Sequence, residues 1–104
     1  MKTSFKEISL PKLNNLTPSL ESTALKLMEE AGELAQAIGK FRGLNGENVT
    51  LSEREIMEKI SEELLDVAQV AVSMMFVLEE KYNINIEEKL KAHIEKLKRK
   101  GYIK

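Results

Sequence analysis

The residues of this chain that most strongly suggest chemistry are two pairs of acidic side chains. Glu30 and Glu33 lie three positions apart, and Glu63 and Asp66 repeat that spacing later in the chain. On an α-helix, positions three apart share a face, about one turn from each other. Two such pairs on facing helices would gather four negative charges, and this arrangement requires a cation to neutralise it.

The cation would have to be held by oxygen atoms. The chain has no cysteine and one histidine, which excludes thiolate sites and sites built from several histidines. All-oxygen ligation suits a hard ion, Mg²⁺ or Mn²⁺. Mg²⁺ on carboxylates usually also binds substrate phosphates, so a phosphate-bearing substrate is expected.

The alternative to a metal site is a helical bundle whose acids are solvated or paired with Lys or Arg. Glu-x-x-Glu alone is most often a solvated helix face. Here both pairs lie along apolar stripes, and Asp66 falls within the most apolar segment of the chain. An acid in such surroundings needs a partner or a metal.

Three helices are expected to position these side chains. Apolar residues recur at offsets of three and four in three successive segments, and no long segment alternates as a strand would. The expected ranges are about 18–41, 52–81 and 86–100. The predicted fold class is therefore all-α, a helical bundle, preceded at residues 1–17 by an arm or a short helix.

Capping signals give the expected helix starts. Thr17 is the expected N-cap of the first helix, with Pro18 at its first position. Ser52 and Glu55 fit a capping box at the start of the second helix. Asn85 is the expected cap of the third helix.

The second helix is apolar on almost every side between Leu64 and Leu78. Such a helix must be covered all round, which two other helices of one short chain cannot readily do. A second copy is therefore expected to complete the bundle, as a homodimer or a homotetramer. The stretch is shorter than the roughly 20 apolar residues of a membrane span, and Asp66 interrupts it, so no membrane partner is expected.

Length and composition narrow the function classes. The 104 residues allow one domain, and 42% hydrophobic with 32% charged residues is typical of a globular protein. The net charge of −1 lacks the basic excess of nucleic-acid-binding proteins, so no nucleic acid is expected as a partner. The N-terminus lacks the apolar core of a signal peptide, and a cytoplasmic protein is expected.

The acidic motifs in their surroundings resemble the MazG-like, all-α nucleoside triphosphate pyrophosphohydrolase superfamily. The segment "LKLMEEAGELAQAIGKFRG" is similar to the first motif helix of that family, and "EELLDVAQVAVSM" to the second. The resemblance covers about residues 18–101 and implies a MazG-like domain at 18–104. Phosphoribosyl-ATP pyrophosphohydrolases and dimeric dUTPases share this plan, so the preferred base and sugar stay open.

The resemblance implies a Mg²⁺-dependent enzyme that hydrolyses nucleoside triphosphates to monophosphate and pyrophosphate, clearing non-canonical or surplus nucleotides. Carried over to this sequence, the metal ligands are Glu30, Glu33, Glu63 and Asp66. Either Glu30 or Glu33 would be the catalytic base that takes a proton from the attacking water.

The third helix departs from the family pattern. Where many relatives carry a phosphate-facing Lys with Asn and Arg nearby, the matching register has His93, Leu97 and Lys100. His93, Lys96 and Lys100 are the expected substrate-binding residues, and a packed histidine beside a solvated basic face is the alternative. The departure also leaves open a non-catalytic helical oligomer that binds a nucleotide or a protein partner.

Overall fold

The computed structural model describes residues 2–42 and 52–104, which form three α-helices. Helix α1 spans Leu20–Arg42, α2 spans Glu53–Tyr82 and α3 spans Ile86–Arg99. No strand occurs within these two ranges. The expected all-α class is confirmed, and each expected helix range is close to the observed one.

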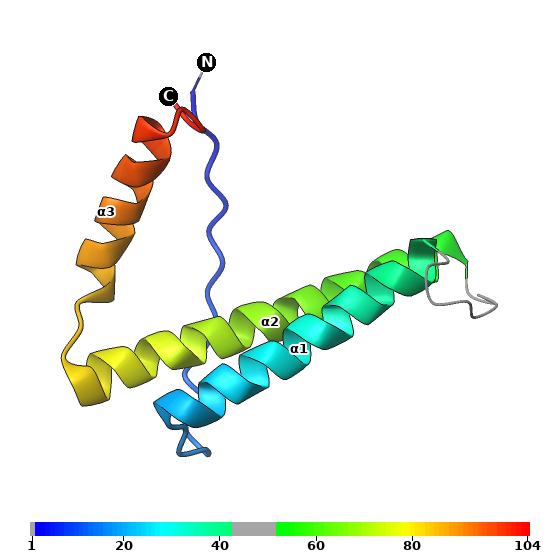
Figure 1. Cartoon of the computed structure of the whole chain (residues 1–104), viewed down its shortest axis with the longest axis horizontal. Coiled ribbons are helices and arrows are strands. Elements are labelled where there is room, and N and C mark those ends of the chain that lie inside the picture. Colours follow the sequence, from blue (N-terminus) through cyan, green and yellow to red (C-terminus); the bar gives the residue numbers. More distant parts are fainter. Residues whose placement is uncertain (1, 43–51) are drawn as a thin grey trace.

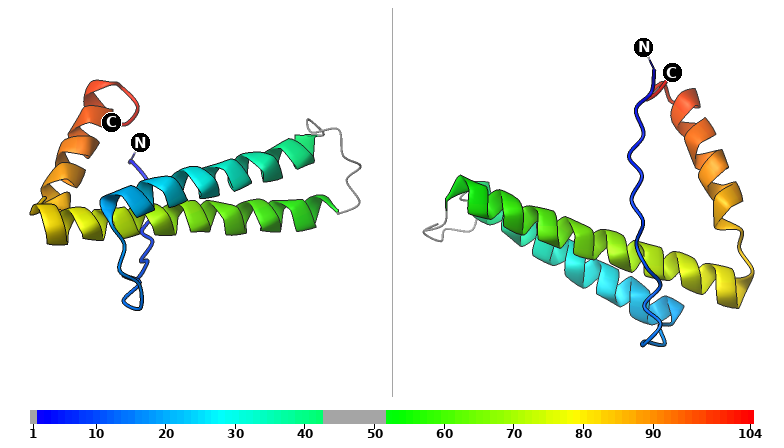
Figure 2. Two further views of the ribbon diagram at one scale, coloured as in Figure 1. Left: turned by 60° about the horizontal axis from the view of Figure 1, so that its bottom comes forward. Right: turned by 180° about the vertical axis from the view of Figure 1, so that it is seen from behind.

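Helices α1 and α2 form a long antiparallel hairpin, and α3 leaves the end of α2 at a steep angle (Figure 1). Among the described helices, α3 contacts only α2. Residues 2–19 contain no helix, so the N-terminal segment is an arm. The arm crosses α2, and its N-terminal part lies near the C-terminus of the chain (Figure 2). Lys12 in the arm forms an ion pair with Glu80 of α2.

The start of α1 differs from the expected one. The helix begins at Leu20, so the prediction of Thr17 as N-cap and Pro18 as first residue is wrong. Ser19 caps the helix instead: its Oγ accepts a hydrogen bond from the Ser22 amide at 3.0 Å, and Ser22 Oγ accepts one from the Ser19 amide at 2.8 Å. This reciprocal pair satisfies backbone donors that a helix start leaves unpaired.

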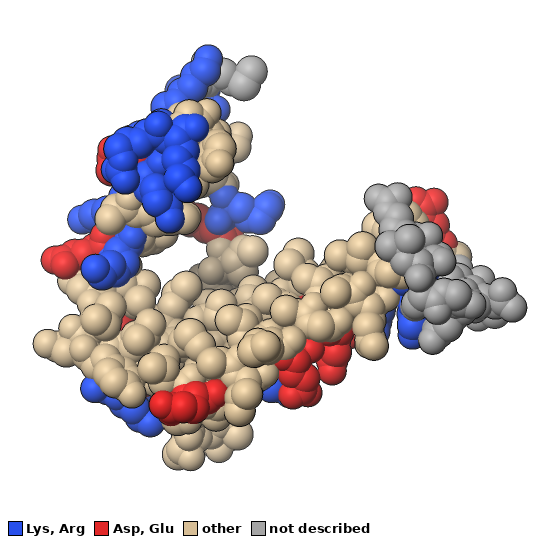
Figure 3. Space-filling model, in the orientation of Figure 1, with Lys and Arg blue, Asp and Glu red and all other residues tan. Residues whose placement is uncertain are grey.

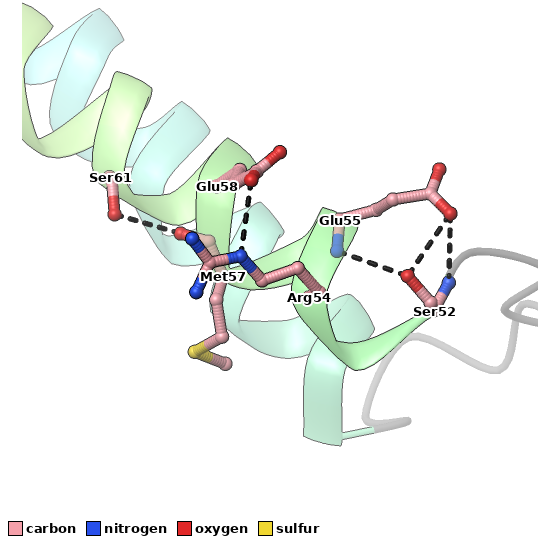
Figure 4. Close-up of polar contacts among 6 residues, drawn as sticks. All are labelled: Ser52, Arg54, Glu55, Met57, Glu58 and Ser61. Carbon is pink, nitrogen blue, oxygen red and sulfur yellow. Dashed lines mark hydrogen bonds and ion pairs between the residues drawn. The ribbon is translucent and has the colours of Figure 1, made fainter.

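The caps of the other two helices are as predicted. The Glu55 amide donates to Ser52 Oγ at 3.2 Å, and the Ser52 amide donates to Glu55 Oε1 at 3.4 Å (Figure 4). The Asn85 side chain accepts a hydrogen bond from the Glu88 amide at 3.1 Å. These short-range contacts fix where α2 and α3 begin.

The core of the single chain is a narrow seam between α1 and α2. Among the described residues, the buried apolar side chains are Ala37, Ile56 and Val77. Buried positions recur every seven residues on α1, as Thr23, Glu30 and Ala37, and Glu63 follows Ile56 at the same spacing on α2. This spacing is typical of helices that pack along one shared seam. The row of buried positions on each of the two helices therefore contains a glutamate, Glu30 on α1 and Glu63 on α2.

Much of the apolar surface of the hairpin faces away from this seam. Met28 is 74% exposed, Leu25 70% and Leu64 55%. One broad face of the hairpin shows few charged side chains, whereas Lys and Arg gather on α3 (Figure 3). An exposed apolar area of this kind usually marks an interface, so the prediction of a second copy stands as a prediction. No described helix is long and apolar enough to cross a bilayer.

Candidate metal centre

Three of the four expected ligands converge between α1 and α2. Each of Glu30, Glu33 and Glu63 offers a carboxylate oxygen, and these oxygens lie within 4.8 Å of one another. Glu30 and Glu63 occupy the seam and are only 8% and 7% exposed, whereas Glu33 is exposed at its edge. The two helices thus bring together acids that are 30 or more positions apart in the sequence.

Each buried glutamate is paired through one oxygen to a lysine of its own helix. Lys26 Nζ lies 3.2 Å from Glu30 Oε1, and Lys59 Nζ lies 3.1 Å from Glu63 Oε1. The hydrogen bond to Glu30 raises the pKa of Lys26, and the one to Glu63 raises the pKa of Lys59. These lysine partners were not predicted from the sequence, although a lysine four residues before a glutamate is a spacing at which the two side chains meet on a helix.

The second oxygens of the buried glutamates are not satisfied. Glu30 Oε2 and Glu63 Oε2 are buried and have no hydrogen-bond partner among the described residues. Leaving a buried acceptor unpaired costs roughly 1–3 kcal/mol, and more when the group is charged. A divalent cation, which prefers carboxylate oxygens, would satisfy both atoms, so the donor set fits such an ion.

The pKa of Glu33 reflects the negative charge of the neighbouring carboxylates. The neighbouring Glu30 carboxylate raises the pKa of Glu33 above its ordinary value of 4.5, and desolvation and Glu63 act in the same direction. Glu33 faces solvent at the edge of the cluster.

Asp66 lies outside the three-carboxylate cluster. It is exposed, and with Glu30 it lines a cavity beside the cluster. Although its neighbours in the sequence are apolar, Asp66 is therefore solvated in the single chain. Its role as a fourth ligand stays a prediction.

The three expected substrate-binding residues lie elsewhere in the fold. His93 and Lys96 are exposed on α3, and Lys100 is exposed at its C-cap. Helix α3 follows the end of α2, which is roughly 28 Å along the helix axis from Glu63 at 1.5 Å per residue. Figures 1 and 2 show α3 apart from the middle of the hairpin. Within one chain, α3 does not bring these residues to the carboxylates.

Two cavities adjoin the cluster. One, of about 490 Å³, is lined by Glu30 and Asp66 and by mainly apolar surface. The other, of about 670 Å³, is lined by Glu33, Glu63 and Lys59 together with further charged side chains. The carboxylates therefore lie between a mainly apolar cavity and one whose charged lining is mostly acidic.

A helical hairpin with carboxylates on both facing helices defines an all-α protein with a candidate divalent-metal centre. The sequence profile of the MazG nucleotide pyrophosphohydrolase domain matches residues 18–101, which is most of the chain. The chain therefore belongs to this family, whose members are nucleotide pyrophosphohydrolases that generally depend on a divalent metal. No curated protein and no solved structure matches the chain.

Proposed function

We propose that this protein is a Mg²⁺-dependent nucleoside triphosphate pyrophosphohydrolase that releases nucleoside monophosphate and pyrophosphate. One observation carries the proposal: Glu30 and Glu63 each have a buried oxygen beside Glu33 that no described residue hydrogen-bonds, in a chain of the MazG family. Mn²⁺ is the alternative ion because it accepts the same oxygen ligands. Clearance of non-canonical or surplus nucleotides in the cytoplasm is the role that we propose for this activity.

The ion would be held by Glu30 and Glu63, with Glu33 and Asp66 as further ligands at the edge of the seam. When bound, the ion would neutralise phosphate charge and make a bound water more acidic. Lys26 and Lys59 each hold one oxygen of a buried glutamate, and this contact fixes the orientation of the carboxylate.

Of the two candidate bases, Glu33 has the better surroundings for taking a proton from water. It is exposed, so water reaches it. Glu30 is buried and already accepts a hydrogen bond from Lys26 through one oxygen. Glu30 is therefore proposed as a ligand only, and Glu33 as a ligand at the edge of the seam that also takes the proton.

The proposed active form is a homodimer or a homotetramer. The exposed apolar side chains of the hairpin, such as Met28 and Leu64, support it. The position of α3 supports it as well. His93, Lys96 and Lys100 would reach a carboxylate cluster only if α3 lay against the hairpin of another copy.

The test is pyrophosphate release from a panel of ribonucleoside and deoxynucleoside triphosphates with Mg²⁺. Release is expected from at least one nucleotide and should be lost in Glu33→Gln and in Asp66→Asn. Glu79→Gln is the control, because Glu79 is an exposed acid of α2 outside the cluster and both adjoining cavities. No release from any nucleotide, or release that both cluster variants retain, would contradict the proposal.

The second candidate function is nucleotide binding without hydrolysis. The observation that favours it is the departure in α3, where His93 and Leu97 stand in place of the Lys and Asn of relatives and His93 is exposed. Calorimetric titration separates the two functions. Saturable binding of a triphosphate without pyrophosphate release would identify the non-catalytic protein.

A further inference from the structure

The single chain is much less compact than a folded domain of its length. Its radius of gyration is 17.0 Å, whereas a compact domain of 104 residues has a radius of gyration of roughly 13 Å. Its accessible surface is 8568 Å², against roughly 5,900 Å² for a compact monomer of this size. Two copies together therefore expose roughly 5,000 Å² more than two compact monomers would. That excess is within the range that obligate homodimers bury, roughly 2,000–5,000 Å² or more.

Two segments of the chain stand away from the hairpin on the same side of it. They are residues 2–10 of the arm and helix α3, and the N- and C-termini lie close together at their far ends (Figures 1 and 2). We propose that residues 2–10 and the apolar face of α3 form a clasp that closes on the α1–α2 hairpin of a second copy. This inference rests on the assembly in the proposed function and names the segments that hold it together.

Residues 2–10 are the part of the arm that its own chain does not hold. The arm is fixed to α2 from Pro11 onward, where Gln69 Nε2 donates a hydrogen bond to the Pro11 carbonyl oxygen at 2.8 Å. Within the described ranges, residues 2–10 form no hydrogen bond or ion pair. Phe5 is nevertheless 70% exposed and Ile8 59% exposed. Large apolar side chains on a segment that makes no polar contact indicate an interaction surface.

Helix α3 is the other half of the clasp, and its apolar face is uncovered. Four apolar residues recur at offsets of four and three along it: Ile86, Leu90, Ile94 and Leu97. None of the residues of α3 is buried, and Leu90 is 55% exposed. A helix of 14 residues is marginal by itself in water and normally depends on the packing of its apolar face. Residues 2–42 and 52–104 of the same chain do not provide a surface that covers this face.

The hairpin of a second copy fits the clasp in size and in polarity. Residues 2–10 span roughly 30 Å when extended, and α3 is roughly 21 Å long. Two packed helices of roughly 10 Å diameter can therefore be crossed by either segment. The hairpin offers exposed apolar side chains, among them Leu25, Met28 and Leu64. In a two-fold dimer, the clasp of each copy covers the hairpin of the other, so that both uncovered surfaces are buried together.

Charge favours a second copy of this chain over another partner. Lys and Arg side chains gather on α3, whereas Asp and Glu gather along one edge of the hairpin (Figure 3). Helix α3 has five basic and three acidic residues, and Lys100 follows it. In the middle of the hairpin, Glu29, Glu33 and Glu62 are exposed. The clasp and the hairpin therefore carry opposite charge, which attracts two copies and orients them. The family match begins at residue 18, so the arm's half of the clasp lies outside the matched domain.

The first test is sedimentation equilibrium of the full chain and of arm variants over a range of concentrations. Phe5→Ala and Ile8→Ala should each raise the Kd of self-association roughly tenfold to a hundredfold, because each removes an apolar side chain that the interface buries. Leu16→Ala is the matched control for Ile8→Ala: it removes the same number of carbon atoms from the same arm at nearly equal exposure, 61% against 59%. Leu16 lies in the part of the arm that α2 holds, so Leu16→Ala should change this Kd less than threefold.

A second measurement identifies the surface that the clasp contacts. The chain has no cysteine, so one introduced cysteine is a unique site for a crosslinker. A protein carrying Phe5→Cys is mixed with one carrying Leu25→Cys, Met28→Cys or Leu64→Cys and treated with a short bifunctional maleimide. Crosslinks between the two different chains are expected for at least one of these three pairs. Glu58→Cys is the control, because Glu58 is an exposed acid of α2 rather than part of its apolar surface, and no crosslink is expected there.

The outcomes separate this inference from the proposed function. Self-association that depends on Phe5 and Ile8 supports the clasp even if no nucleotide is hydrolysed, and the absence of hydrolysis would then contradict only the proposed activity. Pyrophosphate release by an oligomer whose Kd is unchanged in Phe5→Ala and Ile8→Ala would overturn the clasp and leave the proposed function standing. The clasp is also overturned if the wild type is a monomer, if Leu16→Ala weakens association as much as Ile8→Ala does, or if Phe5→Cys crosslinks only to Glu58→Cys.

Discussion

Glu63→Gln should stabilise the metal-free protein, although it removes an ion pair. Glu63 and Glu30 are both buried, and their cluster oxygens lie within 4.8 Å of each other. At that separation, two unit charges repel by roughly 3.5 kcal/mol at an effective dielectric constant of about 20, and by roughly 0.9 kcal/mol in bulk water. Neutralising Glu63 removes this repulsion while glutamine keeps the shape of the side chain.

The lost contact between Glu63 and Lys59 offsets only a small part of this gain. An i,i+4 pair near the surface contributes about 0.3–0.5 kcal/mol. The Lys59 side chain is 58% exposed and stays solvated, so no charge is left buried without a partner. The expected net stabilisation is roughly 0.5–3 kcal/mol. The melting temperature should rise with it, by about 4–8 °C for each kcal/mol in a chain of this size.

The assay is thermal and urea unfolding at fixed protein concentration, first in EDTA and then over a Mg²⁺ titration. A bound ion stabilises the wild type by about 2.7 kcal/mol when its concentration is a hundred times its Kd. Glu63→Gln should lose most of that gain, because one of the ligands is then neutral. The variant should therefore be more stable than wild type in EDTA, and this advantage should shrink or reverse in Mg²⁺.

Glu58→Gln is the matched control for this experiment. It is the same substitution on the same helix, and it also removes an i,i+4 pair, between Arg54 Nε and Glu58 Oε1 at 3.1 Å. Glu58 is not a member of the carboxylate cluster, so the variant should be slightly less stable than wild type in EDTA and should respond normally to Mg²⁺. If Glu63→Gln destabilises the metal-free protein as much as Glu58→Gln does, the reasoning about converging charge is refuted.

Three further predictions concern the pH dependence, the assembly and the helix start. Because the native pKa of Glu33 is raised above 4.5, Glu33 holds its proton more firmly in the native protein than in the unfolded chain just above that pH. The contribution of Glu33 to metal-free stability should therefore fall as the pH rises from 4.5 through its native pKa. In urea titrations over this range, wild type should lose stability relative to Glu33→Gln, and an equal slope in both proteins would contradict the prediction. Met28→Lys should convert the expected oligomer to monomers in sedimentation experiments, because Met28 is 74% exposed in the single chain, whereas a monomeric wild type would refute the assembly. Ser52→Ala should cost about 1 kcal/mol in urea unfolding, because the amide of Glu55 loses its acceptor, and an unchanged midpoint would show that this cap is dispensable.

The helices and most of their caps were predictable because their signals are local. The reciprocal contacts of Ser52 and Glu55 span three residues, and so does the contact of Asn85 with Glu88. The start of α1 was missed because Thr17-Pro18 is also a helix-start pattern. The contact that caps α1 joins Ser19 to Ser22. It therefore departs from the Ser-x-x-Glu form of the capping box.

The cluster was predictable in outline but not in its burial. Residues three apart on a helix differ by about 60° around the axis, so one member of each pair enters the seam while the other lies at its edge. Glu30 and Glu63 are the buried members, and Glu33 and Asp66 are the exposed ones. Because α1 and α2 run antiparallel, Glu33 and Asp66 lie toward opposite ends of the cluster, next to different cavities.

The positions of the arm and of α3 could not be read from the sequence. Both depend on contacts between distant segments, such as that of Gln69 with the Pro11 carbonyl, and no local pattern encodes them. The amphipathic pattern of α3 predicts a helix with one apolar face but not the surface against which that face packs. The expected proximity of His93 to the carboxylates rested on the family pattern alone, and the single chain does not provide it.

The presence of a divalent cation between α1 and α2 is tested most directly by anomalous diffraction from crystals grown with Mn²⁺. We expect a strong anomalous peak within coordination distance of Glu30 Oε2 and Glu63 Oε2, the oxygens to which no side chain in residues 2–42 and 52–104 is hydrogen-bonded. A map without a peak there, with both carboxylates still paired to Lys26 and Lys59, would contradict the account.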